Sequence, residues 1–442
     1  MNRFNAFALG LLLCAHAFPA EQPSLPLAIA HITIVDTLRG TVQPDSTVVI
    51  RQNKIERVGT DAPPADALIV DGSGKFLIPG LWDMHVHLGY TTSSALPLFV
   101  ANGITTVRDM GGSLAELDAW RTKIGAGLLT GPRILRVGPM LNGQKFNPYQ
   151  MVPGNPDETR GVARALKEVG VDFIKIHRRL PRDSFFALLD EAKRLGIAVV
   201  GHIPMTVTPE EASDAGQVTI EHTETLFEGM FSTGLKEGEL PAAIRRFRSG
   251  DADRLFARFV RNHTAVTPTL APFRSLIDAS DPGSTPDPRM RYVAASMRKA
   301  FQQPPVSLAE LHNMKEQFVE YCEVVRQMNR DGVTLLAGTD SAGPRVPAFS
   351  LHHELALLVD CGLTPLQALQ AATLTPATVT GHDDFGTVAG GKTADLVILD
   401  ANPLQDIHNT ERIAAVILDG KLLRRSDLDS LLRQAEELAK RN

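Results

Sequence analysis

The sequence contains little cysteine and no surplus of positive charge. Three cysteines occur among its 442 residues, and the formal net charge is −5 at pH 7. A nucleic-acid-binding surface needs a concentration of lysine and arginine, so we expect no nucleic-acid partner. Low-complexity segments and short-period repeats are also absent, which leaves an alternation of strands and helices as the only repetition. The hydrophobic fraction of 43% is sufficient for one large domain with an appendage.

The first 20 residues have the pattern of a secretory signal peptide. Arg3 precedes an apolar run over residues 4–17, and small residues and Pro19-Ala20 follow it. The run is too short to span a membrane, so we expect a signal peptide over residues 1–20 that is cleaved after Ala17 or Ala20. For a bacterial source, this predicts a secreted or periplasmic protein that does not contact a membrane after the signal peptide is removed.

The few cysteines bear on the same prediction. Cys14 would be removed with the signal peptide, which leaves Cys322 and Cys361 in an oxidising compartment where they could pair. Both lie in helix-patterned segments, and we therefore expect two free, buried thiols.

Two histidines alternate at the end of a predicted strand, in the run from Leu77 to His87. Residues i and i+2 of a strand lie on one face, so His85 and His87 could share a metal ion. Alternating histidines also occur on ordinary half-exposed strands. The pair alone does not decide between these interpretations.

Four further strand-like segments end in a side chain that can bind metal. Each is apolar and rich in β-branched residues, as expected of strands buried in a parallel sheet. A single polar residue at a strand end has local explanations, such as a core histidine, a helix cap or a lysine that reaches solvent. Such explanations become improbable when five strands share the feature. The four segments end at Lys175, His202, His222 and Asp340.

The segments between these strands are long enough for helices that return the chain to the start of the sheet. The clearest helices are predicted at residues 158–169 and 183–195. Further strands at 105–108, 133–137 and 264–270 bring the predicted total to eight. This alternation predicts an α/β protein with a (β/α)8 TIM-like barrel. The polar strand ends then lie at the C-terminal face, where such barrels hold their active sites.

These motifs resemble the amidohydrolase superfamily, in the branch of imidazolonepropionase-like and prolidase-like enzymes. That branch includes relatives of Xaa-Pro dipeptidases, carboxypeptidases and ochratoxin hydrolases. The resemblance covers almost the whole chain after residue 20. It rests on the stretches Gly103 to Asp109, Gly201 to Pro204, Ile220 to His222, Ala337 to Ser341, Leu363 to Thr373 and Gly386 to Val397.

The resemblance implies a domain organisation and a metal centre with two ions. Residues 79–378 would form the barrel, residues 21–78 and 379–424 a small β-sandwich, and residues 425–442 an amphipathic helix packed on the surface. The stretches 226–262 and 275–330 exceed ordinary connections, and we expect helical excursions around the barrel mouth there. One metal ion would be held by His85, His87 and Asp340, the other by His202 and His222, with Lys175 bridging both as a carbamate.

Nitrogen and carboxylate donors without thiolates suit zinc, which we expect as the native metal. The carbamate is needed because a protonated lysine would repel a divalent cation. By family analogy Asp340 is the catalytic residue, which takes a proton from the attacking water and passes it to the leaving amine.

Four residues near these strand ends are candidates for binding the substrate. His177 lies two residues beyond Lys175, and Arg178 follows it as a possible clamp for a substrate carboxylate. Tyr149 and His352 lie in segments that could reach the same pocket. For each of these residues, packing or solvation is the alternative.

The resemblance implies an exported binuclear zinc hydrolase of peptide-like amide bonds, in dipeptides, N-acyl amino acids or amide-linked toxins such as ochratoxin. A lactone, cyclic-amide or phosphotriester hydrolase is the alternative on the same site. A non-catalytic binding barrel is the alternative from another class. The expected partner is a small molecule with an amide bond, and a homo-oligomer is compatible with the sequence.

Overall fold

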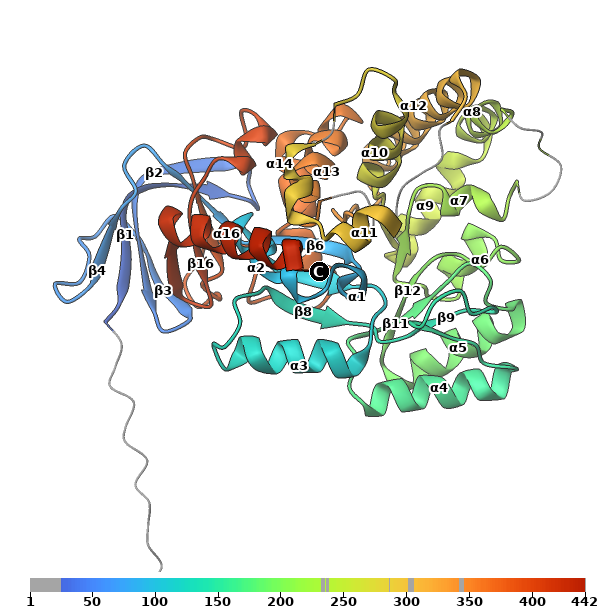
Figure 1. The fold of residues 1–442 in the computed structure, drawn as a ribbon, viewed down its shortest axis with the longest axis horizontal. Coiled ribbons are helices and arrows are strands. Elements are labelled where there is room, and N and C mark those ends of the chain that lie inside the picture. Colours follow the sequence, from blue (N-terminus) through green and yellow to red (C-terminus); the bar gives the residue numbers. More distant parts are fainter. Residues whose placement is uncertain are drawn as a thin grey trace, which may run out of the picture.

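The computed structural model describes residues 25–231, 235, 238–285, 287–300, 306–341 and 346–441. The predicted signal peptide, with Cys14, lies outside the described residues. None of the helices within the described ranges combines the length and the apolar character that crossing a bilayer requires. Figure 1 shows a sheet at one side of the molecule and a larger body of short strands surrounded by helices at the other.

The larger body is built on parallel strands. They form one three-stranded sheet, β6-β7-β8, and one six-stranded sheet, β10-β9-β11-β12-β13-β14. Residues 333–341 add isolated parallel bridges to β14 at Leu335 and to β6 at Ser341. The strands are β6 (Leu81–Val86), β7 (Ile104–Asp109), β8 (Arg133–Arg136), β9 (Met140–Leu141), β10 (Gln150–Met151), β11 (Phe173–Ile176), β12 (Ala198–Gly201), β13 (Thr219–Glu221) and β14 (Ala265–Thr267).

These observations confirm an α/β protein with parallel sheets. The described strands do not form the expected closed barrel. They pair in two separate sheets. Every residue of β6, β7 and β11 is buried, including the polar residues that these strands contain, as expected of strands covered on both faces.

Helices surround the parallel strands of this body (Figure 1). The described parts of the two long stretches, 226–262 and 275–330, contain helices, as predicted. Asn155 caps the helix before β11, and Gly196, with φ of +62°, ends the helix after it. The helices are α1 (Leu88–Thr91), α2 (Leu96–Ala101), α3 (Leu114–Gly125), α4 (Pro156–Glu168), α5 (Arg182–Leu195), α6 (Pro209–Asp214), α7 (Thr225–Glu228), α8 (Leu240–Gly250), α9 (Ala252–Asn262), α10 (Leu270–Ser280), α11 (Ala295–Ala300), α12 (Leu308–Arg330), α13 (Phe349–Asp360), α14 (Pro365–Ala371), α15 (Leu374–Val379) and α16 (Arg425–Arg441).

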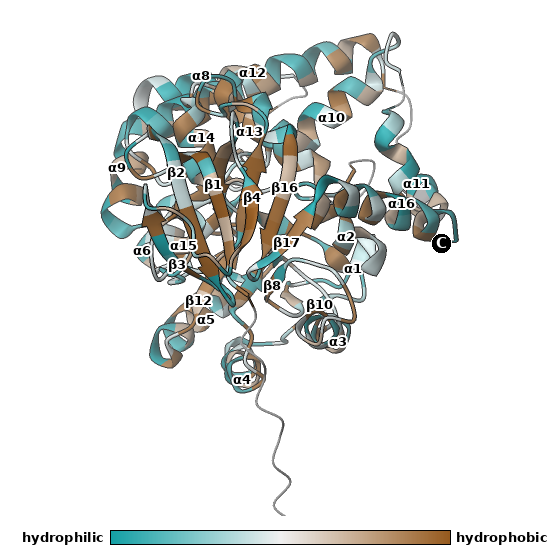
Figure 2. Cartoon of the chain, turned by 90° about the vertical axis from the view of Figure 1, so that its left-hand side faces the viewer, coloured by the Kyte–Doolittle hydropathy of each residue, from teal (hydrophilic) through white to brown (hydrophobic). Residues whose placement is uncertain are grey.

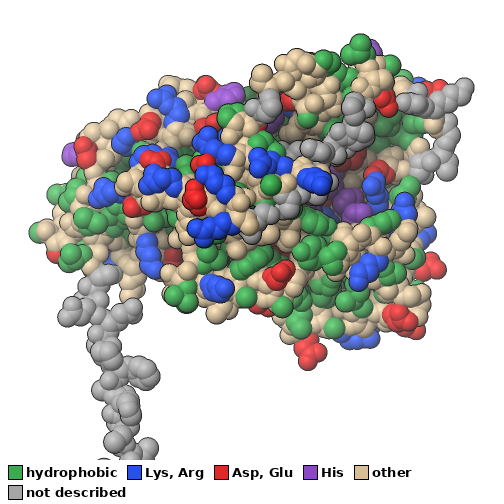
Figure 3. Space-filling view, viewed as in Figure 1, with side chains coloured by type: hydrophobic (Ala, Val, Ile, Leu, Met, Phe, Trp, Pro, Cys, Tyr) green, Lys and Arg blue, Asp and Glu red, His purple; other side chains and the backbone are tan. Residues whose placement is uncertain are grey.

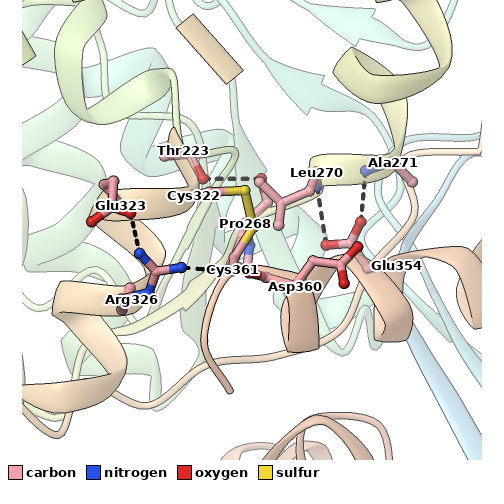
Figure 4. The surroundings of a disulfide bond; sticks show 10 residues. All are labelled: Thr223, Pro268, Leu270, Ala271, Cys322, Glu323, Arg326, Glu354, Asp360 and Cys361. Carbon is pink, nitrogen blue, oxygen red and sulfur yellow. Dashed lines mark hydrogen bonds and ion pairs between the residues drawn. A yellow bond between two sulfur atoms is a disulfide. The ribbon is translucent and has the colours of Figure 1, made fainter. Parts of the chain in front are cut away.

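The cysteines correct one prediction. Cys322 in α12 and Cys361 directly after α13 form a disulfide, with their Cα atoms 4.6 Å apart (Figure 4). The prediction of two free thiols was wrong because the two helices pack against each other and bring the residues together. Helical structure at each cysteine excludes pairing only within one helix, not between two.

The sheet at the other side comes from both ends of the chain. It is one eight-stranded mixed sheet in which β15 pairs with β5 and so joins the two ends. Figure 2 shows that its strands are largely hydrophobic. β5 and β17 were not predicted, and the division of the chain into domains stays a prediction. The strands are β1 (Leu27–Asp36), β2 (Thr41–Arg51), β3 (Lys54–Gly59), β4 (Leu68–Asp71), β5 (Phe76–Pro79), β15 (Leu396–Leu399), β16 (Ile413–Leu418) and β17 (Lys421–Arg424).

Candidate metal centre

Three of the predicted metal ligands meet at the carboxyl end of β6. His85 lies in β6, His87 directly follows it, and Asp340 stands in the segment bridged to it. One ligand atom of each lies within 4.8 Å of the others. The His87 Nε2 atom is 3.2 Å and the His85 Nε2 atom 3.7 Å from Asp340 Oδ1. This spacing allows a single cation to contact all three side chains.

The other predicted ligands surround the same point. The ring of His222 lies 4.7 Å, between centroids, from the rings of both His85 and His202. Lys175 projects from β11 into a cavity of about 160 Å³. Figure 3 shows histidine side chains at the bottom of a hollow in the surface. The cavity is lined by His87, Tyr90, Met140, Asn147, Gln150, Lys175, His177, His202, His222 and Asp340.

Several donor atoms in this cluster have no partner within the described protein. His85 Nε2, His202 Nδ1 and Lys175 Nζ are buried and make no hydrogen bond. A buried polar atom without a partner costs about 1–3 kcal/mol. Polar atoms that converge on one point without partners fit a bound cation, provided that the nitrogens keep free lone pairs.

The electrostatics of the cluster leave those lone pairs free. Burial is the main cause that lowers the pKa of His85 and His202 well below the usual range, and it lowers the pKa of His222 to about 4. The imidazoles are therefore neutral at physiological pH, as metal ligands must be. Burial also lowers the pKa of the Lys175 amine to about 8. Burial therefore keeps the rings of His85, His202 and His222 uncharged, whereas the Lys175 amine loses its proton more readily than an ordinary lysine but stays mostly protonated at pH 7.

A buried pair beneath the cluster orients His85, and the sequence analysis did not identify it. The His85 Nδ1–H donates to Glu221 Oε2 (3.0 Å), which leaves Nε2 facing the cavity. Arg108 donates to the other oxygen of Glu221 (2.7 Å) and to the Met84 carbonyl (2.8 Å). The sequence position of Glu221, directly before the predicted ligand His222, could have indicated that it lies near the metal centre.

Asp83 is a second residue that the sequence analysis missed. Its carboxylate accepts hydrogen bonds from the His85 and Thr339 backbone N–H groups and from the Thr339 hydroxyl. These bonds tie the strand that contains His85 to the segment that contains Asp340. The spacing of Asp83 two residues before His85, on the same strand face, could have indicated it.

The backbone is strained at two of the ligands. His222 and Asp340 have φ angles of +70° and +43°, in the left-handed region that non-glycine residues rarely adopt. His222 directly follows β13, Asp340 directly precedes the bridge residue Ser341, and both side chains line the cavity. Such conformations cluster at functional sites, where the surrounding structure enforces them.

The four substrate-binding predictions have different outcomes. His177 lines the cavity, with its ring 4.3 Å from that of His202. Arg178 instead donates to Glu228 (2.5 Å) and borders a separate cavity. The Tyr149 hydroxyl donates to the Gly89 carbonyl, and its ring packs behind Tyr90.

His352 does not reach the pocket, and its prediction as a substrate-binding residue is corrected here. Its side chain is buried in α13, where Nε2–H donates to the Asn102 carbonyl (3.1 Å) and Nδ1 hydrogen-bonds the Thr410 hydroxyl (3.0 Å). The side chain therefore faces the protein core.

A family model for the amidohydrolase family matches residues 76–423, which include the whole cluster and most of the chain. The chain belongs to the amidohydrolase family. This confirms the predicted resemblance and the prediction of a hydrolase. Metal binding is typical of the family, and the His85, His87 and Asp340 group agrees with it.

Other amidohydrolases resemble the chain over most of its length. A dihydroorotase of Pelotomaculum thermopropionicum is 25% identical over 85% of this chain and 89% of its own length. An imidazolonepropionase of Idiomarina loihiensis is 26% identical over 81% of this chain and 86% of its own. A solved structure assigned as a prolidase of Bifidobacterium longum is 28% identical, covers 93% of this chain and 99% of its own, and has a TM-score of 0.68. Ochratoxinase of A. niger, 18% identical over 90% of this chain and 96% of its own with a TM-score of 0.69, shares the fold.

Proposed function

We propose that the protein is an exported amidohydrolase that cleaves peptide-like amide bonds with two divalent ions, zinc in the native enzyme. The observation that supports this most strongly is the convergence of neutral imidazoles and an unpartnered lysine amine on one cavity. Its substrates would be dipeptides, N-acyl amino acids or related amide-linked compounds. The likeness to a protein assigned as a prolidase supports an amide of this kind.

The donor set fits two ions. His85, His87 and Asp340 would hold one, and His202 and His222 the other, with Lys175 between them. When bound, such a metal pair lowers the pKa of water and polarises a carbonyl oxygen. The Lys175 amine would react with carbon dioxide, forming an N–C bond and releasing one proton, and the resulting carbamate offers two oxygens. This removes the positive charge that would otherwise repel the ions.

We infer that Asp340 would move the proton in the reaction. Its carboxylate lies beside His87 and lines the cavity, so it can take the proton of the attacking water and return it to the leaving amine. Asp340→Asn should lower kcat by about 10²–10⁴-fold. Circular dichroism and metal content should show whether the variant keeps its fold and its ions.

Export is supported by the signal-like N-terminus and by the disulfide, because disulfides persist in oxidising compartments. Cell fractionation of the full-length chain tests this proposal. A protein found in the cytoplasm with residues 1–20 retained would reject export without affecting the proposed chemistry.

Metal analysis and a substrate panel test the chemistry. The purified protein should hold about two ions per chain, as two-metal hydrolases do. The panel should include Xaa-Pro and Xaa-Arg dipeptides, N-acyl amino acids, cyclic amides, lactones and phosphotriesters. Turnover of lactones or phosphotriesters alone would replace the amide by the alternative substrate. Absence of metal together with absence of turnover would contradict the proposal.

A further inference from the structure

A second cavity, of about 500 Å³, lies between helices α7, α8, α10 and α12. Its wall is mostly apolar and aromatic, and includes Met205, Phe227, Phe273 and Tyr321. We propose that this cavity binds a large apolar group, preferably aromatic, of the amide substrate. The inference rests on the proposed amide hydrolysis and adds the substrate class.

The cavity shares its strands with the metal centre. Arg178 directly follows His177 after β11, Met205 comes three residues after His202, and Glu224 comes two residues after His222. The Met205 N–H donates to the Arg178 carbonyl (2.9 Å), which joins the first two of these loops. Loops that follow three of the ligand-bearing strands therefore also line this cavity, and a substrate that extends from the metal centre along these loops would reach it.

Aromatic rings from three helices form the wall. Phe227 of α7 lies nearly parallel to Tyr321 of α12, with ring centroids 6.3 Å apart. Phe273 of α10 meets the same tyrosine edge-on at 5.5 Å. Rings in these arrangements offer both faces and edges to a further ring, and aromatic pairs contribute beyond their buried area. The wall thus favours an aromatic group over a short aliphatic one.

The charged groups at the edge of the cavity disfavour an anion. Arg178 is already paired with Glu228, and Glu224 adds a second carboxyl group on the same edge. A carboxylate placed here would meet two acidic groups and a guanidinium that is already in use. The edge therefore selects against an anionic group at this end of the substrate. It also argues against Arg178 as the carboxylate clamp.

Helix α13 is connected to both of the helices that contribute Tyr321 and Phe273 to the wall. Cys361, directly after α13, is bonded to Cys322, the neighbour of Tyr321 in α12. Glu354 of α13 accepts hydrogen bonds from the Leu270 and Ala271 N–H groups (3.0 and 2.7 Å), at the start of the helix that contains Phe273. Figure 4 shows both connections side by side. A wall held in this way loses little conformational freedom on binding, which is the condition for a selective pocket.

Steady-state kinetics on the metal-loaded full-length enzyme test the proposal. The probes are N-acetylglycine, N-phenylacetylglycine and N-acetylphenylalanine, which differ in whether and where an aromatic group is present. An aromatic group on one side of the amide should raise kcat/KM by about 10–200-fold over N-acetylglycine. Phe273→Ala should remove about tenfold of that gain while kcat/KM for N-acetylglycine changes less than about threefold. Phe186→Ala, on α5 and away from the cavity, is the matched control.

Met205→Trp provides a second test that removes no core side chain. Met205 is 39% exposed, and a tryptophan there would fill the cavity rather than open it. It should cause the same selective loss for the aromatic substrates. Equal losses for all three substrates, or no preference for aromatic groups in the wild type, would overturn the proposal.

If no amide is cleaved, the proposed function fails and the cavity is tested by calorimetry on the same proteins. Tighter binding of N-phenylacetylglycine than of N-acetylglycine, lost in Phe273→Ala, would support the pocket by itself. Equal binding would overturn it.

Discussion

Helix α13 and the carboxyl ends of the parallel strands bury titratable side chains equally deeply, but they treat them differently. His352 and Glu354 in α13 are 2% and 0% exposed, and each has its hydrogen-bonding atoms matched by neighbours. His85 and Lys175 at the strand ends are both 0% exposed, yet His85 Nε2 and Lys175 Nζ have no partner within the described protein.

The difference separates structural from functional polar groups. A buried side chain with matched partners stabilises the packing around it, whereas a buried side chain without them destabilises the protein until a ligand supplies the partner. Burial and a shifted pKa occur in both regions, so neither property identifies the site. Unmatched buried atoms also occur elsewhere, for example on Arg136 and Arg248, but those of His85, Lys175 and His202 gather around one cavity, and this clustering distinguishes the site.

Replacing Lys175 is the strongest test of this comparison. Lys175→Met keeps the volume of the side chain and removes the unmatched amine, so the metal-free variant should unfold at a higher temperature than the metal-free wild type. Activity should fall by more than the roughly 10–100-fold typical of residues behind the ligands. Calorimetry of metal-free protein and turnover with added metal measure both effects. A variant that stays active with metal would show that Lys175 is not a ligand.

A second test replaces Glu221, which hydrogen-bonds the predicted ligand His85 from beneath the cluster. The Glu221→Gln variant keeps a hydrogen-bond acceptor for His85 Nδ1–H but loses the negative charge that both His85 and Arg108 contact. Metal affinity or activity should fall by about 10–100-fold. Titration with a chromophoric chelator measures the affinity. A conserved affinity together with a lower melting temperature would assign Glu221 to stability alone.

The strands and their polar ends could be predicted from the sequence because each signal is local. Lys175, His202 and His222 end short apolar runs, and strands that run parallel bring such ends to one edge. The mixed sheet was predictable only in part. β5 is four residues long, and its partner β15 lies more than 300 positions along the chain. A short run of this kind has no periodicity that would separate it from a loop.

The sequence could not indicate which way a side chain faces or which residues of distant elements pair. His352 and His177 have similar sequence surroundings, but one faces the core from a helix and the other faces the cavity. The disulfide between Cys322 and Cys361 depends on how α12 packs against α13. Arg178 could be identified as a charged residue near the site, whereas its partner Glu228 becomes evident only from the fold.

Glu354 offers a test through the pH dependence of stability. Burial raises the pKa of its carboxyl group to about 8, above the ordinary value of 4.5, so the folded state holds a proton that the unfolded state has lost. Stability should therefore fall as the pH rises from about 4.5 to about 8, by up to ~1.4 kcal/mol per pH unit from this group. Glu354→Gln does not titrate and should remove this slope. Urea unfolding of both proteins across this range measures it, and parallel curves would contradict the assignment.

His352 is expected to show the smallest effect on activity. Burial lowers its pKa to about 4, so the ring stays neutral and changes no charge at physiological pH. His352→Gln should cost about 0.5–1.5 kcal/mol of stability through one weakened hydrogen bond. Because the ring lies outside the cavity, kcat/KM should change less than about threefold, within the range of effects that do not involve the transition state. Thermal unfolding and kinetics on one preparation separate the two quantities. A loss of activity without a loss of stability would return His352 to the site and remove the distinction between matched and unmatched buried groups.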